Sequence, residues 1–300
     1  AWHDKALKIA RDFGPDIVHG AVYEGEALAA SIGLRLPGVK VITEETDDPA
    51  NRRWTGNLLM YAICMSADIC IGVSQTAISY LRHKLHLPKR KVRLVNNAVS
   101  EVPPPTSDML TALCKEFGIK DGDFIIGSVG RVFDDCKRFS DLIRAMPAVL
   151  AQHPQARLMI VGDGPDRSIL EKLCFTLGVG NSVIFAGYRS DVRTFYPLMD
   201  IFALASAHEA FGLVLVEAMF AEVPIIGTEV GGIPFVLDSG RCGALVPPLA
   251  PLSLSRTLSD LIASPSLRAE YARLGLARAR EEFSAERYCR EIDELYTSLI

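Results

Sequence analysis

The sequence has no pair of cysteines at the C-x-x-C spacing and no histidine at ligand spacing beside a cysteine. A C-x-x-C pair or a histidine at ligand spacing would indicate a zinc site, and paired cysteines around a small core would indicate a disulfide framework. We therefore expect the cysteines to be small buried side chains in a reducing compartment. There are seven of them, at positions 64, 70, 114, 136, 174, 242 and 289.

A long uninterrupted apolar run is also missing. The richest apolar stretch, residues 58–73, is broken by Ser66 and Asp68 and is too short to span a bilayer. The start shows no signal-peptide pattern. We expect a cytoplasmic protein, with a peripheral location at the inner membrane face as the alternative. The chain starts at Ala1, without Met, inside a helical pattern, so we expect part of its amino terminus to be missing.

The chain has no excess of positive charge. Its net charge of -4 and its pI of about 5.9 argue against a general nucleic-acid binder, and we expect no nucleic-acid partner. Its 300 residues, 49% of them hydrophobic, can bury a large core and favour two domains.

Short β-rich runs alternate with helical patterns, which predicts βαβ units on parallel sheets. We predict the α/β fold class, with two doubly wound, Rossmann-like domains facing a cleft. The predicted strands are residues 16–19, 39–43, 68–73, 92–95, 124–129, 158–161, 183–186, 201–205, 223–227 and 244–246.

A Pro-rich, weakly patterned segment at residues 100–108 interrupts this alternation, so we place an interdomain linker there. The predicted organisation is a first domain at 1–100, a linker at 101–121, a second domain at 122–283 and a closing helix at 284–300. Ligands are expected at the carboxyl ends of the second domain's strands.

The most informative feature is a pair of glutamates eight positions apart, Glu209 and Glu217, around a strand-to-helix junction. Gly212 marks the turn into a predicted helix at 213–221. A helix start offers unpaired N–H groups to a phosphate, and carboxylates can each accept two hydrogen bonds from sugar hydroxyls. The alternative is that both glutamates are solvated surface side chains.

A second cluster opens the second domain, where a strand ends at Gly130-Arg131 and Lys137 follows six residues later. The glycine lets backbone approach a ligand, and the two cations together can neutralise a diphosphate. Solvated surface cations are the alternative.

Two glycine turns follow the next strands. Gly162-Asp-Gly164-Pro165 lacks the third glycine of the dinucleotide fingerprint, because Arg stands at position 167, which disfavours nicotinamide binding. It predicts instead a tight turn and a helix from Pro165 to about Leu173. After Gly187, Tyr188 or Arg189 can pack on a base, although Tyr188 can equally be an ordinary rim aromatic.

The last turn carries the double glycine Gly231-Gly232, followed by Ile233-Pro234. It is consistent with backbone N–H groups approaching a ligand, or with a plain turn.

Taken in order, these elements resemble the retaining glycosyltransferases of family 4, which have the two-domain GT-B architecture. The resemblance covers nearly the whole chain. It is carried by Gly130-Arg131 with Lys137, Gly162-Asp-Gly-Pro165, the E-x7-E pair around Phe211-Gly212-Leu213, Gly231-Gly232, and Gly243-Ala-Leu-Val-Pro-Pro248.

The resemblance implies a hexosyl-type transferase that uses a nucleotide-diphosphate-sugar and a sugar or lipid-linked acceptor. Arg131 and Lys137 would hold the donor diphosphate, Glu209 the transferred sugar and Glu217 the ribose. We assign catalysis to Glu209, Arg131 and Lys137. Donor binding is assigned to Gly130, Arg131, Lys137, Gly164, Tyr188, Glu209, Phe211, Gly212, Leu213 and Glu217.

The first domain resembles the family's acceptor domain, with three departures. Glu45 stands where relatives carry a His, and Phe235 stands where they often carry a Glu. The family's opening strand and glycine-rich loop have no counterpart before Ala1. These departures weaken any inference about the acceptor and leave the donor site nearly whole.

Cleavage of a nucleotide-sugar leaves negative charge on the diphosphate, which Arg131, Lys137 and the helix start near Gly212 would stabilise. No metal and no cofactor are therefore expected. The acidic pairs Asp47-Asp48 and Asp134-Asp135 are not D-x-D motifs, and we interpret them as solvated. The resemblance implies retention of the anomeric configuration, with the acceptor attacking from the leaving-group face.

Two features of the first domain stay open. His19 ends a predicted strand and has either a direct or a structural role. The basic stretch at residues 82–93 contains no acid and can lie on anionic lipid, as a lipid-linked acceptor would require, or it is a solvated helix end and loop.

Two other functions compete with sugar transfer. One is a sugar-nucleotide epimerase or a phosphorylase of similar architecture, which the E-x7-E pair disfavours. The other is a non-catalytic or truncated relative that binds nucleotide without turnover, which the departures at Glu45 and Phe235 motivate.

Overall fold

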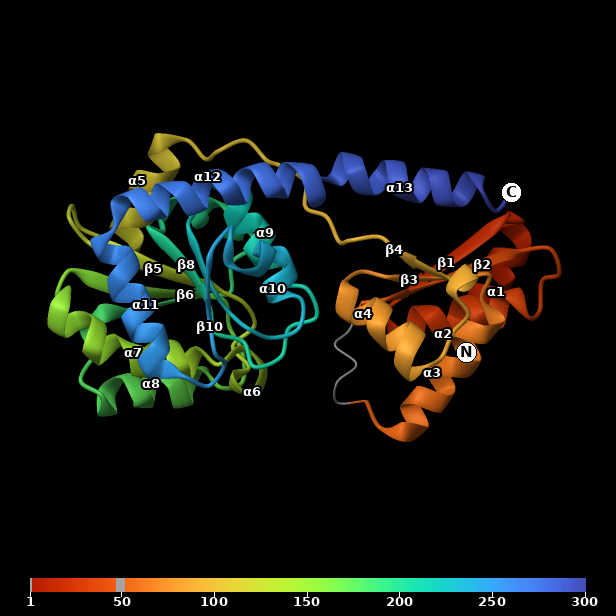
Figure 1. Cartoon of the computed structure of the whole chain (residues 1–300), viewed down its shortest axis with the longest axis horizontal. Coiled ribbons are helices and arrows are strands. Elements are labelled where there is room, and N and C mark those ends of the chain that lie inside the picture. The colour runs from red at the N-terminus through yellow and green to blue at the C-terminus, as the bar shows by residue number, and fades with distance from the viewer. Residues whose placement is uncertain (1, 47–51) are drawn as a thin grey trace. The chain divides into compact units, whose positions relative to one another are not determined.

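Every run of residues predicted as a strand forms one in the computed structural model, with ends shifted by up to two residues. The structure describes residues 2–46 and 52–300 (Figure 1). All strands pair in parallel, in one four-stranded and one six-stranded sheet. The predicted α/β class with two parallel-sheet domains is confirmed.

The sheets belong to two units. Unit 1 takes residues 1–97 and 285–300, and unit 2 takes residues 98–284. None of the described helices combines the length and the apolarity that crossing a bilayer requires.

Unit 1 has the strand order β1-β2-β3-β4. Its strands are β1 (Ile17–Ala21), β2 (Lys40–Glu45), β3 (Ile69–Gly72) and β4 (Val92–Leu94). Its helices are α1 (Trp2–Phe13), α2 (Val22–Gly33), α3 (Trp54–Ser66), α4 (Gln75–Ser79) and α13 (Ala285–Thr297), with the short turns η2 (Tyr80–Lys84) and η3 (Lys89–Lys91).

Side chains alternate between the two faces of this sheet, because successive residues of a strand point in opposite directions. Val41 and Cys70 pack in one core with Met60 and Ile63 of α3. The other face is covered by the C-terminal helix α13 and contains Ile42, Ile69, Ile71 and Val95 with Ile292 and Leu295. The last helix of the chain therefore completes the core of the first unit.

Unit 2 has the strand order β10-β9-β8-β5-β6-β7. Its strands are β5 (Phe124–Val129), β6 (Ala156–Val161), β7 (Val183–Gly187), β8 (Ile201–Leu204), β9 (Ile225–Thr228) and β10 (Ala244–Val246). Its helices are α5 (Ser107–Phe117), α6 (Asp134–Lys137), α7 (Phe139–Gln152), α8 (Arg167–Thr176), α9 (Leu213–Phe220), α10 (Ile233–Val236), α11 (Pro251–Ala263) and α12 (Pro265–Glu282), with short turns η4 (Gly180–Ser182), η5 (Val192–Thr194), η6 (Tyr196–Leu198) and η7 (Asp238–Gly240).

Helices cover both faces of the six-stranded sheet. The core on one face contains Leu142 of α7 and Leu258 of α11. The core on the other contains Leu215 of α9 and Ala279 of α12. Leu113 of α5, which lies within the segment predicted as a linker, is part of the second core.

Two helices of unit 2 can be compared with the bounds that the sequence predicted. The helix predicted at 213–221 forms as α9 and ends one residue earlier. The helix predicted to start at Pro165 begins at Arg167 and continues to Thr176. Its start is displaced because Asp166 is held in the preceding loop: its N–H donates to the Val132 carbonyl over 3.3 Å, and its carboxylate accepts from the Asp134 N–H over 2.7 Å.

Candidate active site

The candidate site of unit 2 lies where β5 and β8 are neighbours in the sheet. The chain leaves β5 toward β6 on one side and leaves β8 toward β9 on the other. The loops after these two strands therefore separate, and in open α/β sheets ligands bind in the crevice that such loops leave. The loop after β5 carries Gly130, Arg131 and Lys137, and the loop after β8 carries Glu209.

An ion pair joins the two loops. The Lys137 ammonium lies 2.6 Å from Oε2 of Glu209, and the two side chains are 24% and 13% exposed. The Ser206 hydroxyl donates to the same carboxylate oxygen over 3.2 Å. The loops are also tied by their backbones, since the Ala207 N–H donates to the Cys136 carbonyl over 2.8 Å. Two residues that the sequence places 72 positions apart thus form one charged centre.

Gly130 and Gly212 lie on either side of this centre. A Cβ added at Gly130 would lie 3.8 Å from Cε of Lys137, and one added at Gly212 would lie 3.5 Å from Cγ of Glu209. Gly212, with φ of +93°, turns the chain into α9. The first N–H groups of a helix have no partners within the helix, so the start of α9 presents amide donors beside Glu209.

The other two residues of this turn play different parts. The Phe211 side chain is 2% exposed and packs edge-on against Phe283, with ring centroids 5.4 Å apart. The Phe211 side chain therefore packs in the core, whereas the Leu213 side chain is 43% exposed. The contact between the Phe211 and Phe283 rings therefore anchors the turn to the core.

Arg131 lines a neighbouring pocket of about 470 Å³ that Tyr188 and Val192 also line. Its side chain is exposed, and within the described part of the chain no acidic side chain forms an ion pair with it. Tyr188 is 79% exposed, as a rim aromatic would be. Arg189 is already engaged, since it pairs with Asp191 and its guanidinium lies 5.0 Å from the ring centre of Phe195.

The glycines of the β6–α8 turn serve backbone packing. A Cβ at Gly162 would lie 1.9 Å from the Gly130 carbonyl oxygen, and one at Gly164 would lie 2.2 Å from the Val132 carbonyl oxygen. Both distances are far shorter than a van der Waals contact, so only glycine allows this turn to pack against the loop after β5. Gly162 also lines the Arg131 pocket, but Gly164 does not.

The double glycine does the same for the loop after β8. Gly231 has φ of +53°, and a Cβ there would lie 1.7 Å from the Glu209 carbonyl oxygen. The Gly232 N–H donates to that same carbonyl over 3.0 Å. Of the two interpretations offered by the sequence, the structure favours a turn that holds the Glu209 backbone in place.

Glu217 lies apart from this centre, in a second pocket of about 360 Å³. The Tyr196 hydroxyl donates to its Oε2 over 2.7 Å, and Nε of Arg193 lies 3.7 Å from its Oε1. Tyr196 is 1% exposed, and burial together with the Glu217 carboxylate holds its pKa well above the usual value. Glu217 is thus fixed by a buried hydrogen bond.

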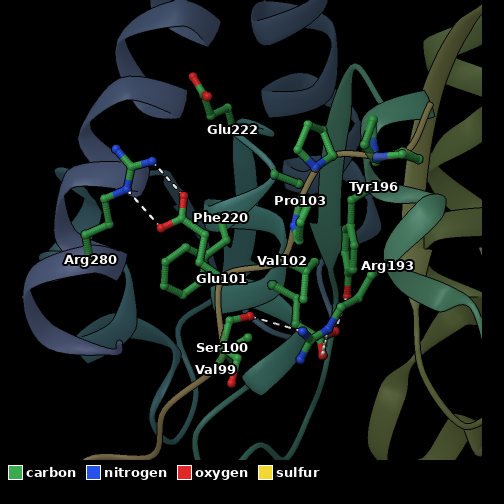
Figure 2. Close-up of a pocket in the computed structure, with 15 residues that line it drawn as sticks. Val99, Ser100, Glu101, Val102, Pro103, Arg193, Tyr196, Phe220, Glu222 and Arg280 are labelled. Carbon is green, nitrogen blue, oxygen red and sulfur yellow. Dashed lines mark hydrogen bonds and ion pairs between the residues drawn. The ribbon is translucent and has the colours of Figure 1, made fainter. Parts of the chain in front are cut away.

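This second pocket is formed by segments far apart in the sequence (Figure 2). Figure 2 shows Arg193 and Tyr196 on one side and the Glu101–Arg280 ion pair on the other, with Val102 and Phe220 between them. The Arg193 guanidinium also donates to the Ser100 carbonyl over 3.0 Å. The turn η5 borders both pockets, because Val192 lines the first and Arg193 the second.

The sequence did not identify Ser206, Arg193 or Tyr196. Ser206 offered a signal, as a polar residue at the end of an apolar strand. Arg193 and Tyr196 lie between motifs, so no pattern marked them.

Of the two acidic pairs in the sequence, the structure describes Asp134-Asp135. The Asp134 carboxylate accepts from the Ser140 N–H over 2.8 Å and thereby caps the start of α7. Asp47 and Asp48 lie outside the described residues. Among the described residues no group of three or more His, Cys, Asp or Glu side chains is arranged to hold a metal ion.

Two of the three departures from the family pattern, Glu45 and Phe235, are side chains with local packing partners. Glu45 is 2% exposed and pairs with both terminal nitrogens of the Arg52 guanidinium, at 2.6 and 3.1 Å. Phe235 packs against Phe283, with ring centroids 6.0 Å apart, and under the guanidinium of Arg278. Each side chain has partners within its own unit.

His19 has partners as well. Its Nδ1 lies 2.8 Å from the Tyr296 hydroxyl of α13, and its Nε2 lies 3.1 Å from the Glu44 carboxylate. These contacts join β1, β2 and the C-terminal helix, which supports a structural role.

Comparisons with known proteins show which sequences this chain resembles. The family description "Glycosyl transferases group 1" matches residues 111–276, and "Glycosyltransferase Family 4" matches residues 1–101. N-acetyl-alpha-D-glucosaminyl L-malate synthase of Bacillus anthracis is 28% identical over 100% of this chain and 79% of that protein. The lipopolysaccharide core biosynthesis glycosyltransferase LpsE of Rhizobium meliloti is 33% identical over 54% of this chain and 46% of its own length.

Solved structures share the fold. A structure of Anabaena Alr3699/HepE in complex with UDP and glucose has a TM-score of 0.88 at 22% identity, over 99% of this chain and 81% of that one. Sucrose-phosphate synthase of Thermosynechococcus elongatus has a TM-score of 0.86 at 22% identity, over 99% and 77%.

The two parallel-sheet units and these matches define a glycosyltransferase of the GT-B class. Within that class, the chain belongs to the glycosyl transferases of group 1, whose family description covers more than half of it.

The contact between Gly231 and the Glu209 loop can be tested through stability. Gly231→Ala places a methyl group against a carbonyl and puts an L-residue at positive φ, so we expect the free energy of unfolding to fall by about 2 kcal/mol or more. Urea unfolding measures it. Gly180→Ala is the matched control, since a Cβ there meets nothing within 4 Å. Equal stability of the two variants would contradict the packing role.

Proposed function

We propose that this enzyme transfers a sugar from a nucleotide-diphosphate-sugar to an acceptor hydroxyl with retention of the anomeric configuration. The observation that carries the proposal is the ion pair of Lys137 and Glu209 at the point where β5 and β8 diverge. In this proposal the ammonium serves the diphosphate and the neighbouring carboxylate serves the sugar. The UDP and glucose named for the Anabaena structure support a donor of this type.

In this proposal the diphosphate meets positive charge from three sources. Lys137 contributes its ammonium and the start of α9 contributes amide dipoles, both beside Glu209. Arg131 contributes an exposed guanidinium without an acidic partner among the described residues. Charge develops on the diphosphate as the bond to the sugar breaks, so these groups stabilise the transition state more than the bound donor.

The bond changes balance without a further reactant. The bond between the anomeric carbon and the diphosphate oxygen breaks, and its electron pair stays on the diphosphate. The acceptor oxygen forms a bond to the same carbon from the same face, which retains the configuration. The proton of the acceptor hydroxyl passes to the departing diphosphate.

The two glutamates have separate tasks in this scheme. Glu209 accepts hydrogen bonds from hydroxyls of the transferred sugar, next to the reacting carbon. Glu217, fixed by Tyr196, accepts from the ribose hydroxyls in the direction of the pocket that it shares with Arg193. Tyr188 lies on the rim of the Arg131 pocket, where a base can pack on its ring.

The acceptor in this proposal is the hydroxyl of a sugar or of a lipid-linked molecule. In this proposal it binds near β1 to β4, where the sequence resembles the family's acceptor domain. The match of "Glycosyltransferase Family 4" to residues 1–101 supports this placement.

Replacing Glu209 tests the proposal most directly. Glu209→Ala removes the sugar contact but frees Lys137 for the diphosphate, so we expect transfer to fall at least 1,000-fold while the affinity for UDP stays within a few-fold. Product formation and calorimetric titration with UDP measure the two effects. Glu270→Ala, at an exposed position of α12, is the control. Unchanged transfer in Glu209→Ala would exclude the assigned role.

The same assay separates the competing functions. Incubation with the donor alone should leave the sugar configuration unchanged, whereas an epimerase would convert it. A nucleotide-binding relative without turnover would bind UDP and form no product with any acceptor offered.

The charge supplied by the protein predicts how activity depends on metal. If Lys137, Arg131 and the helix start neutralise the diphosphate, EDTA should change the transfer rate by less than about twofold. A tenfold loss that Mg²⁺ or Mn²⁺ restores would contradict this part of the mechanism. Lys137→Ala should lower the rate at least 100-fold and should not be rescued by either metal ion.

Tyr196 offers a test of the ribose assignment. Tyr196→Phe removes the hydrogen bond that orients Glu217, worth about 1 kcal/mol, so we expect UDP to bind about five times more weakly. The affinity for 2′-deoxy-UDP should change less, because that ligand lacks a hydroxyl for Glu217. Equal losses for both nucleotides would contradict the assignment, and thermal unfolding would check that the variant is folded.

A further inference from the structure

Helix α3 presents an apolar face to solvent. Trp54 is 77% exposed and Leu58 is 63% exposed, and Leu59, Tyr61 and Met65 are exposed as well. Positions 54, 58, 61 and 65 follow the spacing of one helix face. We refer to Trp54, Leu58, Leu59, Tyr61 and Met65 as the α3 face.

The composition of this helix is unusual for the surface. The opposite side of α3 packs in the core of unit 1 through Met60, Ile63 and Cys64. A helix with one buried side normally carries charged residues on the other. Residues 54–66 contain no charged side chain at all, so the α3 face has the composition of a contact surface.

The segments around α3 are positively charged although the whole chain is acidic. Residues 52–100 contain eight Lys and Arg residues and a single acid, Asp68, whereas the net charge of the chain is -4. Arg82, Lys84, Lys89 and Arg90 are exposed.

Hydrogen bonds join the basic segment, and Tyr80 just before it, to α3. The Lys91 ammonium donates to the Met65 carbonyl over 2.7 Å, at the end of the helix. The Tyr80 hydroxyl, at the start of η2, donates to Oδ1 of Asn57 in α3 over 2.9 Å. Both elements belong to unit 1 (Figure 1), and the Lys91 bond places the basic segment beside the carboxyl end of α3.

We propose that the α3 face and the basic segment at residues 82–93 dock this enzyme onto an anionic lipid surface. Trp and Tyr favour the boundary between headgroups and acyl chains, and Leu and Met bury their side chains just below it. Lysines and arginines near an anionic leaflet add attraction that falls with salt. In a two-fold contact between copies the same basic segment would face itself, and like-charge repulsion would oppose that contact, whereas an anionic leaflet attracts the segment. The inference is independent of the proposed donor site.

The chain carries its own reporter for this contact. Its tryptophans are Trp2 and Trp54, so Trp2→Phe leaves a single indole on the α3 face. With phosphatidylcholine vesicles containing 30% phosphatidylglycerol, we expect a blue shift of its emission and co-sedimentation of the protein. Vesicles of phosphatidylcholine alone should give neither, and 0.5 M NaCl should weaken binding to the anionic vesicles.

Two variants separate the apolar and the electrostatic contributions. Trp54→Ser with Leu58→Ser should lower vesicle partitioning at least tenfold. Replacing Arg82, Lys84, Lys89 and Arg90 by Gln should lower it about 100-fold. The matched control is Phe175→Ser with Leu252→Ser, two exposed apolar residues of unit 2, which should bind like the parent. Circular dichroism checks that every variant is folded.

Other outcomes would overturn the proposal. Equal partitioning of the parent and the Trp54→Ser, Leu58→Ser variant would exclude the α3 face, and equal binding to neutral and anionic vesicles would exclude the basic segment. A parent that does not bind vesicles but sediments as a dimer, and that becomes monomeric in the Trp54→Ser, Leu58→Ser variant, would show that a second copy covers the face.

Discussion

The ion pair between Lys137 and Glu209 is the contact on which the organisation of the candidate site depends. It joins the loops after β5 and β8, and both side chains are largely shielded from water. Each charge would be costly in that place without the other, because a partly buried ion loses hydration that only a partner can replace. The pair therefore keeps a cation and a carboxylate together before any ligand arrives. In the proposed reaction a diphosphate offers Lys137 a second anion, and Glu209 then accepts from sugar hydroxyls without leaving its place.

Glycines make this arrangement possible by letting backbones touch. Gly162 lies against the loop after β5, and Gly231 and Gly232 lie against the loop that carries Glu209. These contacts are too short for any side chain, so they fix where the loops stop. The sequence suggested these glycines as ligand contacts. In the structure they mainly position the loops that carry the charged residues. Preorganisation of this kind is what electrostatic stabilisation of a leaving group requires.

Unit 1 uses its charged residues differently. Glu45 and Arg52 form a buried pair, and His19 connects Glu44 with Tyr296 of the last helix. These acidic residues are buried and paired inside unit 1, and the side chains at the surface around α3 are basic or apolar. The C-terminal helix α13 completes the core of this unit, so segments far apart in the sequence fold together in unit 1.

The strands and their parallel pairing were predictable from the sequence, because strand periodicity and glycine turns are local patterns. The E-x7-E spacing identified Glu209 and Glu217 in the same way, and their role at a donor stays a prediction. Local patterns also predicted where α9 begins, since only glycine suits the turn at position 212. The partners of those residues were not predictable. That Lys137 meets Glu209, that Tyr196 holds Glu217 and that α13 packs on β2 and β3 depend on how distant segments fold together. The sequence by itself determined which chemical groups the protein has and which elements carry them. Only the tertiary structure decided which of these groups lie within hydrogen-bonding distance, because packing between layers, and not spacing along the chain, sets those distances.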